Sequence, residues 1–150
     1  MLTALLFIFI FLLSFNPVAA KFYSSKIIPE TYQNLGTPRD IITLPNGDMW
    51  YVDSQNSRII KINTSGEVLR TVGRSGSGEG EFASELTSIT RDDDGYLYVL
   101  DLCQVYKMDF NGGFMDVFGS CGDEEGQISE PKAIHYSSYD SNLLISDYAH

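Results

Sequence analysis

The chain has 150 residues and a formal net charge of −10, with 20 Asp and Glu against 10 Lys and Arg. This charge argues against a nucleic-acid partner, because no cluster of Lys or Arg is present to displace the counterions of a phosphate backbone. The composition is rich in Tyr and Phe and has more Gly than Pro, which is typical of a sheet protein with many turns.

The first twenty residues predict a signal peptide. They carry no charged side chain, and their apolar run from about Ala4 to Leu13 is shorter than the ~20 residues that span a bilayer. Asn16 and Pro17 end the run, and the small residues of Val-Ala-Ala follow at the positions that a signal peptidase reads. We therefore expect cleavage after Ala20, a lead-in over 21–35 and a secreted or extracellular protein without a membrane partner. The alternative is a chain anchored in a membrane by an uncleaved signal.

An internal repeat begins at about residue 36. Three similar segments, 39–53, 87–101 and 132–147, each end in an aspartate, and these aspartates are 101 − 53 = 48 and 147 − 101 = 46 residues apart. The glycines that follow repeat at a spacing of 46 residues: Gly66, Gly73, Gly76 and Gly80 match Gly112, Gly119, Gly122 and Gly126. This period predicts three units, at 36–82, 83–128 and 129–150.

Each unit alternates short apolar strands with turn dipeptides, which is the signal of β-hairpins. We expect strands at 40–44, 48–52, 58–63 and 68–72 in the first unit. In the second unit we expect them at 87–91, 96–100, 105–109 and 114–118. Four antiparallel strands in a unit of ~40 to 50 residues are typical of a β-propeller blade. The predicted fold class is therefore all-β, with about two and a half propeller blades.

The first unit resembles an NHL repeat. The resemblance lies in Pro38–Ile41, in Asn46–Asp53 and in Asn56–Ile59, which follow the patterns P-x-x-(apolar), a Gly turn with (apolar)-x-(apolar)-x-D, and N-x-R-(apolar). The linker 73–82 is also similar to the spacer between NHL blades. The second unit departs from the pattern, with Cys103-Gln104-Val105 where N-x-R is expected. The resemblance implies a ring of six blades, so that residues 129–150 would be the start of a truncated third blade.

The repeated aspartates Asp53, Asp101 and Asp147 are expected to be structural, each accepting backbone N–H bonds in the turn that follows it. A ring of such aspartates that binds a cation in the channel is the alternative. The run from Asp92 to Gly95 differs from a calcium-binding EF-hand loop, because Asp101 stands where that loop requires Glu. We interpret it as a tight turn flanked by solvated acids.

His135 and His150 are the two histidines of the chain, too few for a three-histidine zinc site. His135 falls on the first predicted strand of the third unit, which lies nearest the axis in propellers, so a position in the channel is the alternative to a purely structural one. No spacing supports a Ser-His-Asp or Cys-His arrangement. The Gly-rich linker 73–82 is interpreted as a flexible connection.

Two cysteines and one asparagine are candidates for covalent modification. The residue numbers of facing positions in a hairpin have a constant sum, which is 223 or 224 for a turn at Asn111-Gly112-Gly113, and Cys103 and Cys121 sum to 224. They are therefore opposite or one position apart, and export favours a disulfide between them; two free thiols are the alternative. Asn63 begins the acceptor pattern Asn-Thr-Ser on a predicted exposed turn, so we expect a glycan there if the source is a eukaryote.

The function favoured by these observations is a non-catalytic binding scaffold. Its loops would present a surface for a protein, peptide or glycan ligand. The resemblance implies an alternative, because NHL-type propellers include the lyase that completes peptide α-amidation and lactonases have a similar outline, and both are metal-dependent. In that case the catalytic site would lie in blades beyond His150. No cofactor is evident in this sequence, and a metal ion in the channel of a full-length ring stays an alternative.

Overall fold

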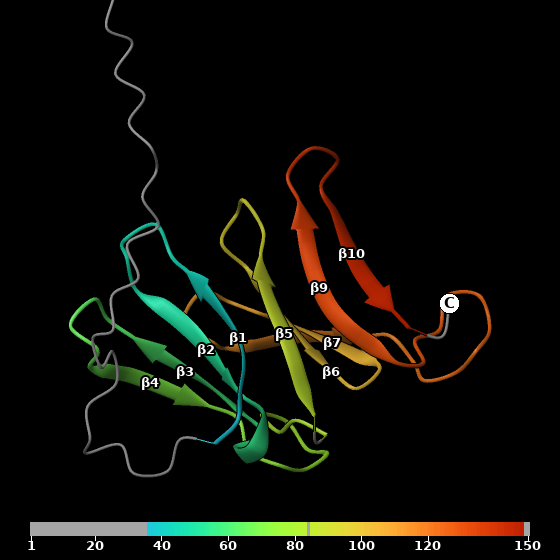
Figure 1. Ribbon diagram of the computed structural model, residues 1–150, viewed down its shortest axis with the longest axis horizontal. Coiled ribbons are helices and arrows are strands. Elements are labelled where there is room, and N and C mark those ends of the chain that lie inside the picture. Colours follow the sequence, from blue (N-terminus) through green and yellow to red (C-terminus); the bar gives the residue numbers. More distant parts are fainter. Residues whose placement is uncertain (1–35, 84, 149–150) are drawn as a thin grey trace, which may run out of the picture.

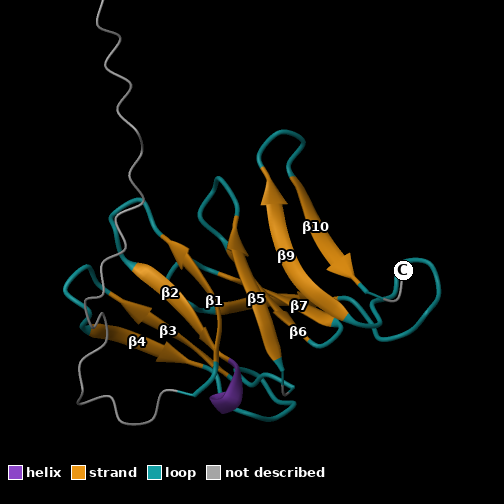
Figure 2. Cartoon of the chain, viewed as in Figure 1, coloured by secondary structure: helices purple, strands orange, loops and turns teal. Residues whose placement is uncertain are grey.

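The computed structural model describes residues 36–83 and 85–148, which form three antiparallel sheets that lie next to one another (Figure 1). The predicted signal peptide 1–20, the whole predicted lead-in 21–35 and His150 lie outside the described residues. Strands and short turns make up nearly all of the described chain, as Figure 2 shows. The single helical element is one turn of 3-10 helix, η1, at Ser54–Asn56 among the described residues.

The first sheet, here called blade one, contains four strands in the order in which they follow along the chain. Tight turns connect them; the first turn is closed by Leu44, whose N–H donates to the carbonyl of Asp48 over 2.7 Å. The strands are β1 (Pro38–Thr43), β2 (Met49–Asp53), β3 (Arg58–Ile62) and β4 (Val68–Val72).

Blade two has the same order and nearly the same lengths. Its strands are β5 (Leu86–Arg91), β6 (Leu97–Asp101), β7 (Gln104–Met108) and β8 (Phe114–Phe118). The third sheet is a hairpin of β9 (Pro131–Ser137) and β10 (Asn142–Asp147). The strands predicted for the first two units are all present, and their ends differ from the prediction by at most two residues.

The repeat is visible in the backbone hydrogen bonds as well as in the strands. In each unit, the residue after the repeated aspartate donates its N–H to a carbonyl in the segment that enters the unit. The three bonds are Ser54 to Thr37 at 3.1 Å, Leu102 to Glu85 at 3.4 Å, and Tyr148 to Glu130 at 3.1 Å. The three units therefore begin in the same way.

The main core lies between blade one and blade two. Trp50, Val52 and Ile59 of blade one pack in one cluster with Leu97 and Val99 of blade two. All five side chains are fully buried. Burying one large apolar side chain contributes about 1.5 to 3 kcal/mol, so this contact between the sheets is a main source of stability.

A second cluster joins blade two to the third sheet. It contains Tyr98, Leu100 and Val105 of blade two, together with Ile134 of β9. Tyr98 and Val105 stand 48 and 46 residues after Trp50 and Ile59, so each blade presents the same face to its successor. Four-stranded antiparallel sheets that stack face to face in this way confirm the predicted fold class, an all-β chain of propeller blades.

Candidate functional site

The first strands of the three sheets, β1, β5 and β9, are neighbours, and they border one hollow of 540 Å³. We call it the axial hollow, because first strands lie nearest the axis in propellers. Figure 1 shows these three strands side by side. The hollow is lined by Asp40, Ile42, Thr43, Ser88, Ile89, Thr90, Arg91, Ala133, Ile134, His135 and Tyr136.

Hydrogen bonds between the units fix the wall of the axial hollow. The backbone N–H of Ile134 donates to Ser88 Oγ over 3.2 Å, and Ser88 Oγ donates to Asp40 Oδ2 over 2.6 Å. The N–H of Ile89 donates to the same carboxylate oxygen over 3.0 Å. One chain of hydrogen bonds therefore crosses all three first strands, and the hollow is formed by a fixed surface.

His135 lines the axial hollow and is exposed, as expected for a residue on the first strand of the third unit. Its neighbour Tyr136 lines the hollow too, and the Tyr136 N–H donates to Thr90 Oγ1 over 3.1 Å. The wall thus offers a carboxylate, hydroxyl groups, an imidazole and an aromatic ring, which can form hydrogen bonds and stacking contacts with a ligand. Within 36–83 and 85–148, no three His, Cys, Asp or Glu residues are grouped as a metal site.

The repeated aspartate of blade one is held by a side chain of the turn that follows it and by the first side chain of β3. Asp53 is fully buried, and its carboxylate accepts hydrogen bonds from Asn56 Nδ2 at 2.9 and 3.1 Å. Arg58 Nε donates to Asp53 Oδ2 over 2.8 Å and forms a salt bridge in which the arginine side chain is 19% exposed. These are the residues of the N-x-R pattern, so the pattern supplies the partners of a buried charge.

The aspartates of the other two units accept backbone N–H groups from a segment that the sequence analysis did not predict. Asp101 accepts the backbone N–H of Ala83 and, over 3.0 Å, that of Glu85. Asp147 accepts those of Ser129 at 2.7 Å and Glu130 at 2.9 Å. These donors precede the first strand of the same unit and are not in the turn after the aspartate. Each carboxylate therefore connects the end of the second strand to the entrance of its unit.

Cys103 and Cys121 form a disulfide, with their Cα atoms 5.0 Å apart. In the hairpin of β7 and β8, Val105 faces Phe118 and Tyr106 faces Val117, so the residue numbers sum to 223 and the two cysteines are one position away from a facing pair. The bridge joins the turn between β6 and β7 to the linker that follows β8. Cys103 is buried and Cys121 is exposed.

The disulfide stands where blade one has two serines. Ser57 and Ser75 are 46 residues before Cys103 and Cys121. The surroundings match as well, because Ser75 forms a parallel bridge with Phe82 and Cys121 forms one with Ile128, again 46 residues later. Blade two therefore has a covalent bond at a position where blade one has hydroxyl side chains.

The acidic turn of blade two is only partly solvated, contrary to the sequence interpretation. Asp93 and Asp94 are exposed, but Asp92 is buried and 8% exposed. Its carboxylate accepts the N–H of Tyr96 at 2.8 Å and the hydroxyl of Tyr98 at 2.9 Å. Burial, followed by the hydrogen bond to Asp92, raises the pKa of Tyr98 to about 12. Sequence alone did not reveal this role, since it depends on the burial of the acid beside the Tyr98 hydroxyl.

Asn63 lies at the turn between β3 and β4, as predicted, and its side chain organises that turn. Its Oδ1 accepts the N–H groups of Ser65 and Glu67, each over 2.9 Å, and its Nδ2 donates to Glu67 Oε2 over 2.7 Å. Asn63 is half-buried, and Thr64 and Ser65 are exposed. Asp109, 46 residues later, accepts the N–H groups of Asn111 and Gly113 in the same way.

The glycine-rich linkers contain hydrogen bonds that their composition did not reveal. In the first linker, Arg74 Nε donates to Glu81 Oε1 over 2.7 Å, and Gly78 N–H donates to Glu81 Oε2 over 2.9 Å. The second linker repeats the latter bond from Glu124 N–H to Gln127 Oε1 over 3.0 Å. Composition missed these bonds because they depend on the side chain at the end of each linker.

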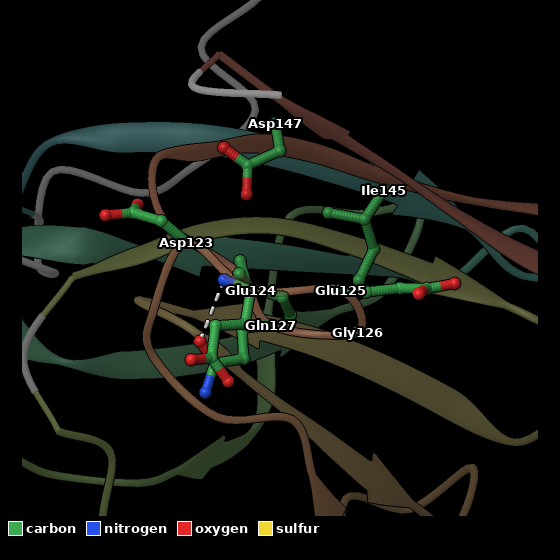
Figure 3. A pocket seen from close by; sticks show the side chains of 8 residues that line it. Asp123, Glu124, Glu125, Gly126, Gln127, Ile145 and Asp147 are labelled. Carbon is green, nitrogen blue, oxygen red and sulfur yellow. Dashed lines mark hydrogen bonds between the residues drawn. The ribbon is translucent and has the colours of Figure 1, made fainter.

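The second linker also borders a pocket of 310 Å³ beside the end of β10. Figure 3 shows Asp147 above the linker, while the side chains of Asp123 and Glu125 point away from one another. Ile128 and Ile145 supply its apolar part. The acidic side chains do not converge on one point, so this pocket is a weaker candidate site than the axial hollow.

No known protein family and no curated protein matches the chain in sequence. In structure, the chain is similar to U3-55K, with a TM-score of 0.60 and 15% identity over 77% of this chain and 35% of that one. It is also similar to hydrazine synthase of Kuenenia stuttgartiensis, with a TM-score of 0.57 and 14% identity over 84% and 32% of the two chains.

Virginiamycin B lyase from Staphylococcus aureus gives a TM-score of 0.54 and 18% identity over 75% of this chain and 35% of the lyase. The chain thus spans about a third of the length of each of these proteins.

No helix among the described residues is long and apolar enough to cross a membrane. The structural neighbours are β-propeller proteins, and the stacked four-stranded sheets of this chain have the same fold.

Proposed function

We propose that the chain is part of an exported, non-catalytic β-propeller that binds a protein, peptide or glycan ligand at the axial hollow. The observation that carries the proposal is that three successive units line one hollow of 540 Å³ with polar and aromatic side chains. Hydrogen bonds from Ile134 to Ser88 and from Ser88 to Asp40 hold this surface in place. A surface that is already ordered loses little conformational entropy when a ligand binds.

Export is part of the proposal. A disulfide such as Cys103–Cys121 persists in oxidising compartments, and this supports a secreted or extracellular location. We also propose that the units are NHL-type blades and that the whole ring has six of them. Asp53 with Asn56 and Arg58 supports the NHL assignment, because the N-x-R residues hold the buried aspartate at the end of the second strand.

The test is a binding screen with the purified, oxidised protein against arrays of glycans and peptides. His135→Ala should weaken a bound ligand by about tenfold, because the loss of one central side chain commonly costs more than 1 kcal/mol of binding energy. Lys132→Ala is the matched control, since Lys132 is an exposed residue of the same strand that lies outside the axial hollow.

The control variant should bind as tightly as the original chain. Equal weakening in both variants would show that the ligand binds elsewhere. Metal-dependent turnover of a ligand at the axial hollow would contradict a non-catalytic function and would favour the alternative of an enzyme. Finding Lys21 as the first residue of the secreted protein tests export separately, and Met1 retained in a membrane fraction would oppose it.

A further inference from the structure

A groove of 420 Å³ lies on the outer rim of blade two, apart from the axial hollow. One wall is the linker segment 77–80, and the other is the last strand, β8, with part of β7. We call it the rim groove. Its lining residues are Ser77, Gly78, Glu79, Gly80, Gln104, Tyr106, Phe114, Met115, Asp116 and Val117.

The floor of the rim groove is aromatic. Phe82 is fully buried, and its ring centroid lies 5.0 Å from that of Tyr106 and 5.3 Å from that of Phe114. The rings of Tyr106 and Phe114 are 5.8 Å apart and nearly perpendicular. Tyr106 and Phe114 are half-buried, so part of this cluster is available to an apolar side chain from another molecule.

The edge strand beside the groove is unusually apolar for a solvent-facing strand. Met115 is 55% exposed and Val117 is 46% exposed. Natural edge strands are commonly protected by charged side chains, above all Lys. The same positions of β4 in blade one, 46 residues earlier, carry Leu69, Arg70 and Thr71. Blade two thus has an acid where blade one has a cation, and a valine where it has a threonine.

The charge at the groove is negative. Glu79 and Asp116 line the groove. Lys107 pairs with Asp116 across the two strands, but its ammonium group lies over the ring of Tyr96, with Nζ 4.2 Å from the ring centroid. Asp116 Oδ1 accepts the N–H of Val117 over 2.8 Å. Because this edge N–H is already bonded, the groove is better suited to receive side chains than to add a further strand.

We propose that the rim groove binds an extended peptide segment of another protein in which an aliphatic side chain stands next to a Lys or Arg. The aliphatic group packs against Tyr106, Phe114 and Met115. The neighbouring cation is attracted by Glu79 and Asp116. Aromatic and Met side chains are enriched at protein interfaces, and complementary charge fixes the orientation of a bound segment.

The experiment measures fluorescence anisotropy of labelled peptides with Gly-Ser flanks around Lys-Leu-Arg, added to the oxidised full chain. A peptide with Glu-Leu-Glu is the comparison. Met115→Lys should weaken binding of the basic peptide by about tenfold, because it removes an apolar contact and adds a like charge. Leu69→Lys is the matched control, since Leu69 holds the same position in blade one and is 51% exposed.

A second pair of variants separates charge from packing. Glu79→Gln should weaken the basic peptide several-fold and reduce the salt dependence of binding, whereas Glu125→Gln, 46 residues later, should leave both unchanged. Val117→Lys with its counterpart Thr71→Lys replaces the first pair if Met115→Lys does not fold. Absence of binding, a preference for the acidic peptide, binding of neutral sugars alone, or equal weakening by a variant and its control would each overturn the proposal.

Discussion

Blade one and blade two have the same strands in the same order. Different bonds, however, stabilise the turn between the second and the third strand of each blade. In blade one the turn after β2 contains a buried salt bridge between Asp53 and Arg58. In blade two this turn is shorter, since the strand pairing closes at Asp101 and Gln104, whereas in blade one it closes at Asp53 and Arg58. The shorter turn contains Cys103, which forms a disulfide with Cys121. One repeat can therefore keep its backbone while its stabilising bonds change.

The residues of blade two that correspond to Leu44 and Trp50 of blade one also differ in chemistry. Leu44 and Trp50 of blade one are buried in an apolar cluster. Asp92 and Tyr98 hold the same positions 48 residues later, and they form a buried hydrogen bond of 2.9 Å. An apolar cluster is stabilised when its side chains fit together in shape. A buried carboxyl group, in contrast, costs free energy unless a hydrogen-bond partner is present. The two pairs of residues should therefore respond differently to substitution.

The largest effect should come from the salt bridge of blade one. Arg58→Met leaves the fully buried carboxylate of Asp53 without its cation, and we expect a loss of about 3 to 4 kcal/mol in the free energy of unfolding. Gln104→Met is the matched change in blade two, where backbone N–H groups already bind Asp101. Urea unfolding measures both. Equal losses in the two variants would contradict the distinction between the blades.

The next effect should come from the disulfide. Replacing Cys103 and Cys121 by serine gives blade two the residues that blade one has at these positions, and it opens a loop with a sequence separation of 18. We expect a loss of about 2 to 3 kcal/mol, because the unfolded chain regains conformational entropy. Reductant should destabilise the original chain to the same extent and leave the double variant unaffected. Two reactive thiols in the denatured, unreduced protein would refute the bridge.

A pair of glycines tests the packing between the blades. Gly112 and Gly95 have φ angles of +84° and +92°, so alanine is strained at either. A Cβ at Gly112 would also lie 2.9 Å from Trp50 Cη2 and from Val72 Cγ2, whereas one at Gly95 would meet nothing within 4 Å. Gly112→Ala should therefore cost about 1 to 3 kcal/mol more than Gly95→Ala. A similar cost for both variants in thermal melts would mean that the blades do not pack here.

The smallest effect on stability should come from Asn63→Asp. Asp109 accepts the same turn N–H groups in blade two, but Asn63 also donates to the carboxylate of the exposed Glu67, so the loss should be about 0.5 to 1 kcal/mol. When the chain is exported by eukaryotic cells, the substitution should abolish a glycan at Asn63. The measurement is gel mobility before and after treatment with a glycan-removing amidase. Unchanged mobility of the original chain would count against the glycan.

The strands, the repeat and the proximity of the two cysteines could be predicted from sequence, because each depends on local alternation of residues or on the register of one hairpin. The hydrogen bond from Ser88 to Asp40 could not, since it joins residues 48 positions apart in different units. The bonds that Asp101 and Asp147 accept from N–H groups 16 to 18 residues away in sequence were not predicted, for a similar reason. Local rules for turns do not extend to such contacts.

Consecutive units of this chain stack face to face as propeller blades. Nuclear Overhauser contacts of Trp50, the single tryptophan of the chain, can detect this stacking in solution. We predict cross-peaks between its indole ring and the α protons of Gly112, which belongs to the outer turn of the next blade. A folded chain in which Trp50 shows contacts only to residues of 36–72 would contradict the stacking.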